Sequence, residues 1–126
     1  MNFRATPLIV VLLLLYSACT ADQLPEPEVG ACGNIEPTYT QDIRPIIESS
    51  CSYSGCHLDG TSGNFQSFAG LRLYLEDGSF RNRVISLRED ETLGMPPNYA
   101  PADRPQDLTD EELDLIGCWL AAGFPE

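Results

Sequence analysis

The chain has 126 residues, which predicts one small domain, and its 19 acidic residues outweigh 7 basic ones to give a net charge of −12. The sequence contains no lysine. Nucleic-acid binding needs basic side chains that contact phosphates, so this composition argues against it. A strongly acidic surface keeps a protein soluble, and it also steers basic protein partners toward it.

The first eighteen residues differ from the rest of the chain, because Arg4 is their only charge and residues 7–16 are almost wholly apolar. This run is shorter than the about 20 residues of a membrane-spanning helix, and it is typical of an export signal. Ser17 and Ala18 before Cys19 resemble the lipobox of bacterial lipoproteins, in which the cysteine is acylated and becomes the N-terminus. The resemblance implies a lipoprotein-like signal peptide over residues 1–18. It also implies a lipid anchor at Cys19 on the periplasmic side of a bacterial membrane or on the cell surface. A plain signal peptide is the alternative.

Residues 19–37 connect this signal to the folded part of the chain. They contain three prolines separated by acidic residues and glycine, a composition that predicts an extended tether. The domain then covers residues 38–126. A domain this small has a thin core, and it often needs a disulfide, a metal or a cofactor to supplement that core.

The first predicted helix covers residues 39–50. Thr40 is the expected N-cap, and Pro45 indicates that the regular helix begins near that position. Its apolar face consists of Ile43, Ile46 and Ile47.

Two further helical stretches follow. Residues 67–87 carry apolar residues at helical spacing but contain Gly78, which predicts two helices separated by a turn. The last helix opens at Thr109 with Glu112 three residues later, the pattern of a capping box. No run shows the alternation typical of a strand, so the predicted fold is all-α with long loops at 58–66 and 94–108.

Four cysteines remain when Cys19 is set aside, and they are Cys32, Cys51, Cys56 and Cys118. Thiols of exported proteins tend to oxidise. An even number allows three full pairings, and it equally allows one disulfide plus a cofactor attached through two cysteines. The even number of cysteines therefore does not distinguish these two schemes.

The stretch "CSYSGCHLDG" places His57 directly after Cys56, with Cys51 five residues earlier. The haem-attachment signature is Cys-x-x-Cys-His, so the gap here is two residues wider. A zinc site with Cys32 or Cys118 as fourth ligand, a Cys–His nucleophile, and a disulfide beside an incidental histidine are the alternatives.

Met95 is the only methionine after the signal segment, and two prolines that stiffen the backbone follow it in "TLGMPPNY". A thioether sulfur is a suitable sixth ligand for haem iron and raises its reduction potential. With His57 as the only histidine, bis-histidine ligation by this chain is excluded. The alternative role of Met95 is ordinary core packing.

Three segments in order resemble a c-type cytochrome of the compact bacterial, planctomycete type. They are "YTQDIRPIIESSCSYSGCHLDG", "MPPNY" and "LTDEELDLIGCWLAAGFPE". The resemblance implies a cytochrome c-like helical domain around one covalent haem c. It also implies Cys51 and Cys56 as attachment points, with His57 and Met95 as axial ligands. The four-residue gap departs from the family pattern, and a single thioether at Cys56 with Cys51 in a disulfide is the alternative.

With two cysteines assigned to haem, Cys32 and Cys118 are left to form a disulfide. The expected function is one-electron transfer between exported partners, without enzymatic activity of its own. The expected partner is a redox protein with a basic docking surface, and the membrane is contacted only through the lipid anchor. Two other functions remain open: a haem-free, disulfide-stapled interaction module on a lipid anchor, and a haem sensor or enzyme subunit in which Met95 dissociates.

Other side chains near these motifs have simpler predicted roles. Trp119 and Phe68 are expected in the core beside the haem, and Tyr53 is expected on the surface. Three arginines are candidates to pair with haem propionates, because a guanidinium group suits carboxylates, or simply with nearby acids. They are Arg81, Arg83 and Arg88.

Overall fold

The computed structural model describes residues 32–59 and 63–126. The predicted signal peptide, most of the tether and the lipid anchor at Cys19 lie outside these residues. The described elements are all helical, with no strand, which confirms the all-α prediction. In chain order they are η1 (Tyr39–Ile43), α2 (Arg44–Ser50), α3 (Phe68–Glu76), α4 (Ser79–Arg81), η2 (Asn82–Ser86) and α5 (Asp110–Ala121).

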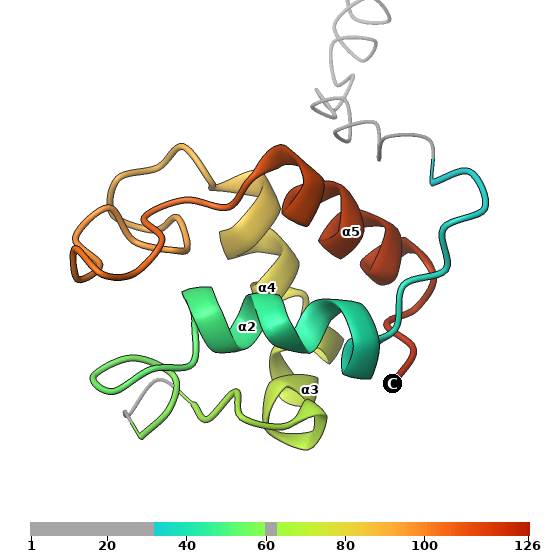
Figure 1. The fold of residues 1–126 in the computed structure, drawn as a ribbon, viewed down its shortest axis with the longest axis horizontal. Coiled ribbons are helices and arrows are strands. Elements are labelled where there is room, and N and C mark those ends of the chain that lie inside the picture. Colours follow the sequence, from blue (N-terminus) through green and yellow to red (C-terminus); the bar gives the residue numbers. More distant parts are fainter. Residues whose placement is uncertain (1–31, 60–62) are drawn as a thin grey trace, which may run out of the picture.

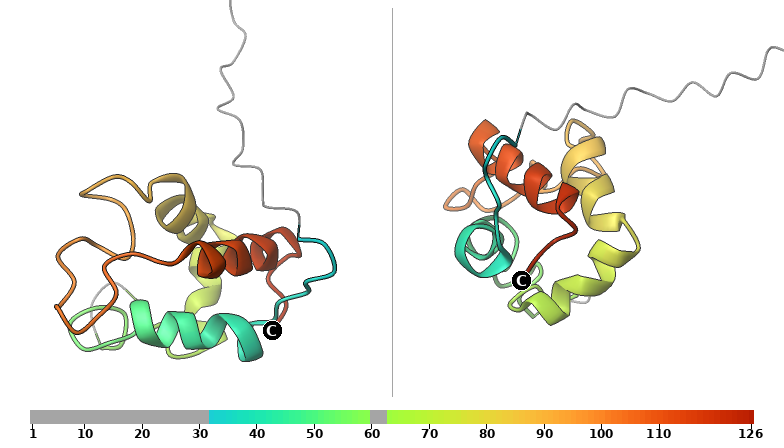
Figure 2. Two further views of the ribbon diagram at one scale, coloured as in Figure 1. Left: turned by 45° about the horizontal axis from the view of Figure 1, so that its top comes forward. Right: turned by 90° about the vertical axis from the view of Figure 1, so that its right-hand side faces the viewer.

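The helices surround a single small core. The π-helical turn η1 runs directly into α2, and α5 packs against η1 (Figure 1). Figure 2 shows that α3 and α4 form a curved wall on the other side of the molecule. The described residues 51–59, 63–67 and 87–109 contain no helix, so the predicted loop at 94–108 is present and the loop at 58–66 has no helix wherever it is described.

The first helical stretch covers residues 39–50, as predicted, and its regular α-helix begins at Arg44, next to Pro45, but its N-cap differs from the prediction. Thr38, and not Thr40, is the N-cap, because its side-chain oxygen accepts the amide of Gln41 at 3.3 Å. Asp42 completes the cap by accepting the amide of Thr38 at 2.9 Å, so two free amide groups are satisfied reciprocally. The predicted apolar face is confirmed as buried and consists of Ile43, Ile46 and Ile47.

Gly78 separates α3 from α4, as predicted. Its φ of 76° lies in the left-handed region that side chains with a Cβ disfavour, and the chain turns there. The predicted capping box of α5 is also present. The Thr109 hydroxyl accepts the amide of Glu112 at 3.2 Å, and the Glu112 carboxylate accepts the amide of Thr109 at 2.8 Å.

Trp119 is the centre of the core, with no exposed surface. Its ring lies 6.2 Å from that of Tyr39 on η1 and 6.3 Å from that of Phe80 on α4, measured between centroids. The indole Nε1 donates a hydrogen bond to the carbonyl of Pro125 at 2.8 Å, and the amide of Tyr39 donates to the same oxygen at 2.9 Å. The prediction that Trp119 is a core residue is therefore confirmed.

Cys32 and Cys118 form a disulfide, with their Cα atoms 5.6 Å apart, which confirms the predicted pair. The bond fixes the start of the described chain to α5. Cys51 and Cys56 remain as free thiols. None of the helices in the described ranges is long and apolar enough to span a membrane.

Removal of the disulfide tests its contribution to this small core. Cys32→Ala combined with Cys118→Ala should lower the free energy of unfolding by about 2–4 kcal/mol, because the unfolded chain is no longer closed into a long loop. Urea unfolding followed by Trp119 fluorescence measures the difference. Peptide mapping without reduction provides the control, and a Cys51–Cys118 or Cys32–Cys51 link in the wild-type protein would contradict the pairing.

Candidate functional site

A cavity of about 460 Å³ lies between the 51–57 loop, α3, the α4–η2 segment and residues 95–99. Its volume falls within the range of about 300–1,000 Å³ that is common for ligand and cofactor sites. Four of its lining residues are the predicted haem ligands and attachment points, namely Cys51, Cys56, His57 and Met95. The fold thus brings together residues from two segments far apart in the sequence.

A tight turn takes up the wider spacing between the two cysteines. The amide of Cys56 donates to the carbonyl of Tyr53 at 3.0 Å, and Gly55 between them has a φ of 85°. A glycine with positive φ at the third position is what a type II turn requires. Asp59 fastens the turn from outside, because its carboxylate accepts the amide of Gly55 at 3.1 Å and the hydroxyl of Ser54 at 3.3 Å.

The two ends of the loop are held close together by the backbone. Cys51 follows directly on α2, and its amide donates to the carbonyl of Ile47 at 2.9 Å. The amide of His57 then donates to the carbonyl of Cys51 at 3.2 Å. These bonds close the loop, so that both sulfur-bearing side chains and the imidazole line the same cavity.

The imidazole of His57 is stacked on the ring of Phe65, with centroids 3.9 Å apart and planes 3° from parallel. Phe65 is held in turn by an edge contact with Tyr74 at 5.0 Å and by a hydrogen bond from its amide to the carbonyl of His57 at 2.7 Å. Gly70 permits this arrangement, because a Cβ there would collide with the carbonyl of Asn64. Phe65 was not predicted as part of the site. Its only signal in the sequence is that it is an aromatic residue in the loop after the two cysteines.

Met95 enters the cavity from the opposite segment and is half-buried. Its amide donates to the carbonyl of Arg83 at 3.1 Å, and the amide of Gly94 donates to the carbonyl of Asp90 at 2.8 Å. A Cβ on Gly94 would come within 2.6–2.8 Å of three backbone carbonyls, so only glycine fits this close approach. Two buried prolines, Pro96 and Pro97, follow Met95 and line the cavity as well.

The structure distinguishes the three candidate arginines. Arg83 lines the cavity, and its Nη1 donates to the carbonyl of Leu93 at 3.2 Å. Arg88 instead donates two hydrogen bonds to the carboxylate of Asp107, at 3.1 and 3.0 Å, and these bonds lower the pKa of that carboxyl group. Arg81 ends α4 and is not among the residues that line the cavity. Arg83 is therefore the arginine placed to contact a group in the cavity.

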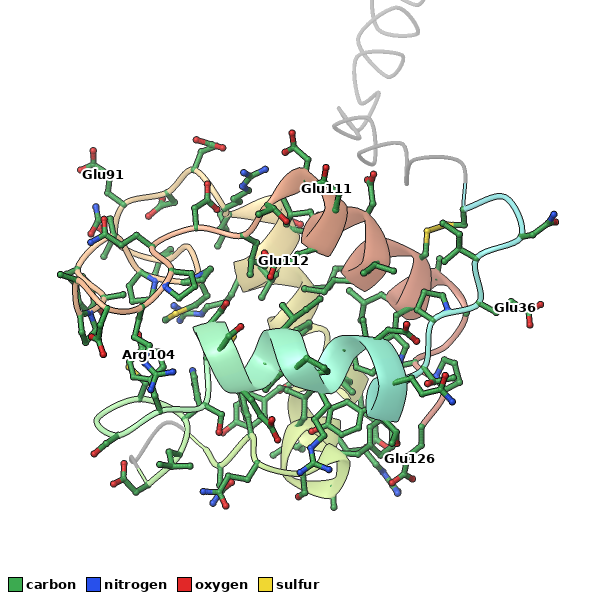
Figure 3. All side chains as sticks on the ribbon, in the orientation of Figure 1. Glu36, Glu91, Arg104, Glu111, Glu112 and Glu126 are labelled. Carbon is green, nitrogen blue, oxygen red and sulfur yellow. A yellow bond between two sulfur atoms is a disulfide. The ribbon has the colours of Figure 1, made fainter. Side chains whose placement is uncertain are left out.

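The prediction that Tyr53 lies on the surface is wrong. The turn folds this side chain inward, where it is 5% exposed and lines the cavity. Arg104 is labelled in Figure 3. Its guanidinium covers the Tyr53 ring at 4.9 Å from the centroid, and its Nη1 donates to the carbonyl of Ser49 at 3.4 Å. Burial raises the pKa of the Tyr53 hydroxyl to about 12, and the neighbouring Cys56 thiol contributes to the shift.

The side chains that line the cavity do not supply a fourth ligand for the zinc site considered above. Cys32 and Cys118, the alternative fourth ligands, are joined to each other. Among the residues that the structure describes, no group of three or more His, Cys, Asp or Glu side chains is arranged to hold a metal ion. His57, the two free thiols of Cys51 and Cys56, and the thioether of Met95 line the cavity together.

No protein-family model, curated protein or solved structure matches this sequence. The function therefore has to be inferred from the cavity and the residues that line it.

The Cys51 thiol should make the protein less stable at alkaline pH. Burial raises its pKa from 9.0 to about 12, and the nearby Cys56 thiol and Glu112 carboxylate act in the same direction. Between these values the unfolded chain loses the proton that the folded chain keeps. The free energy of unfolding should therefore fall by about 1.4 kcal/mol per pH unit from this group.

Urea unfolding of the purified protein at pH 8 to 11 under argon measures that slope. The Cys51→Ser variant is the control, because it keeps the contributions of the buried tyrosines and removes only that of the thiol. Equal slopes for the two proteins would show that Cys51 is not held protonated by the fold.

Proposed function

We propose that this protein is a monohaem c-type cytochrome that carries single electrons between exported redox partners. One observation carries the proposal: Cys51, Cys56, His57 and Met95 all line one cavity. The sequence resemblance predicted these same four residues as attachment points and axial ligands. The all-helical fold and the capped closing helix α5 agree with the domain type that the resemblance implies.

The residues of the cavity suit the haem group in type and arrangement. Cys51 and Cys56 would each form a thioether bond, and the turn at Gly55 allows both sulfurs to face the cavity despite the wider spacing. His57 would hold the iron through a ring nitrogen, with the plane of its ring fixed by Phe65. A haem bound here would supply an iron that gains and loses one electron.

Met95 would provide a soft sulfur ligand from the opposite side, which stabilises the reduced iron and raises the potential. Its backbone is fixed by the bond to Arg83 and by the close packing around Gly94. A weak ligand of this type stays in place only when the protein holds it there. The guanidinium of Arg83 at the cavity wall would pair with a haem propionate.

The segment that contains Met95 is strongly acidic, which supports a basic partner. Residues 89–114 contain nine acidic side chains and one arginine, Arg104. The nine are Glu89, Asp90, Glu91, Asp103, Asp107, Asp110, Glu111, Glu112 and Asp114. Glu91 and Glu111 lie at the periphery of the molecule in Figure 3. We therefore propose a small, transient interface of under about 1,200 Å² with a basic redox protein. Export and a lipid anchor at Cys19 complete the proposal, and they rest on the sequence of the signal segment.

The two alternative functions differ from this proposal in observable ways. A disulfide-stapled interaction module would pair all four cysteines, whereas the fold pairs Cys32 with Cys118 and leaves Cys51 and Cys56 as thiols at the cavity. A haem sensor would release Met95 and bind carbon monoxide at the iron. A stable sixth ligand would resist that exchange.

Expression with a haem-maturation system tests the cytochrome proposal directly. The purified domain should be coloured, and its mass should exceed the polypeptide mass by that of one haem even after denaturation. Cys51→Ala combined with Cys56→Ala is the matched control and should yield protein without covalent haem. Colourless wild-type protein under these conditions would refute the proposal, and a haem lost from Cys51→Ala alone would show that Cys51 is needed for attachment.

Substitution of Met95 tests the sixth ligand. Met95→Ala should abolish the sulfur-to-iron charge-transfer band of the oxidised protein and lower its reduction potential, because the soft donor is gone. Tyr99→Ala serves as control, since Tyr99 also lines the cavity but is 73% exposed, and this variant should keep the band. An unchanged spectrum in Met95→Ala would remove Met95 from the iron and favour the sensor function.

A further inference from the structure

The hydroxyl of Tyr53 is buried and has no hydrogen-bond partner within the described part of the chain. Buried polar groups are normally paired, because an unpaired one has lost its water without gaining a new partner. The ring of Tyr53 is held by the turn at Gly55 and by the guanidinium of Arg104. The hydroxyl therefore cannot reach solvent by a simple rotation of the side chain.

The surroundings of Tyr53 distinguish it from the other buried tyrosine hydroxyl without a partner, that of Tyr39. Tyr53 lines the cavity, whereas Tyr39 packs in the core against Phe68 and Trp119 and is not among the residues that line it. An acceptor inside the cavity would complete the hydrogen bonding of Tyr53 and leave Tyr39 unaffected.

We propose that the Tyr53 hydroxyl donates a hydrogen bond to an acceptor atom of the haem group. The acceptor is a propionate oxygen, which enters the cavity only with the haem. The inference rests on the proposed function, since it concerns the group that fills the cavity. It gives the four-residue gap between the cysteines a role, because the gap places a tyrosine between the two attachment points.

The proposal predicts opposite effects of one substitution on two forms of the protein. Without haem, Tyr53→Phe removes an unpaired buried hydroxyl and should raise the melting temperature. With haem, the same substitution removes a paired hydroxyl and should lower it. A shift of about 4–8 °C in each direction corresponds to one such group in a domain of this size.

Calorimetry or circular dichroism on four samples measures these shifts: wild-type protein and Tyr53→Phe, each prepared with and without the haem-maturation system. Tyr39→Phe is the matched control, and its effect on the melting temperature should be the same in both forms. A shift of the same sign and size for Tyr53→Phe in both forms would overturn the proposal. Such a result would leave haem binding itself intact.

Resonance Raman spectra of the haem protein provide a second readout, which does not require the haem-free form to fold. Tyr53→Phe should shift the propionate bending modes. Tyr39→Phe should leave these modes unchanged. Unchanged modes in Tyr53→Phe would refute the hydrogen bond, whereas wild-type protein without haem would refute the proposed function.

Discussion

The indole of Trp119 lies where η1, α4 and the C-terminal segment meet, and its packing connects the parts of this fold. Its Nε1 and the amide of Tyr39 share the carbonyl of Pro125, so a single backbone oxygen joins the first helical turn to the last helix. The cavity lies beside this core, with Phe80 and Val84 of the core forming part of its wall. In this small domain, part of the apolar surface of the core lines the cavity. A larger protein would bury that surface against another element.

The two sides of the cavity are built differently. Cys51, Cys56 and His57 extend from a helix end through short backbone hydrogen bonds, and their positions follow from α2. Met95 belongs to a long segment without helix, which is held by the glycine at position 94, two buried prolines and the ion pair between Arg88 and Asp107. In the proposed cytochrome, the attachment points and His57 would therefore come from a helix end, and Met95 would come from a long loop that these contacts hold in place.

Periodicity and capping residues were sufficient to predict the helices. The apolar face around Ile43 and the Thr109–Glu112 box are local patterns, and both are present. The N-cap was misplaced because Thr38 gains its advantage from Asp42, and no rule of spacing ranks it above Thr40. The disulfide was predicted by assigning the other cysteines to haem, not from any distance in the sequence.

The errors at the site have a common cause. Tyr53 is buried because a turn and an arginine 51 residues later enclose it, and Arg88 bonds Asp107, 19 residues later, whereas Arg83 lines the cavity. The stacking of Phe65 on His57 depends equally on Gly70 of another element. None of these contacts follows the regular spacing of a helix or strand, so a sequence pattern does not reveal them.

The disulfide and the segments that carry the predicted haem ligands lie at opposite ends of the domain. It fixes the start of the described chain beside the C-terminal end of α5, and the segments 51–57 and 95–99 lie at the other end of the molecule in both figures (Figures 1 and 2). In a lipid-anchored protein, a pull on the tether would be borne by α5 and the covalent bond, and it would not reach the cavity. The domain could then swing at the membrane surface with its ligand-bearing end turned outward, toward whatever protein approaches from solution.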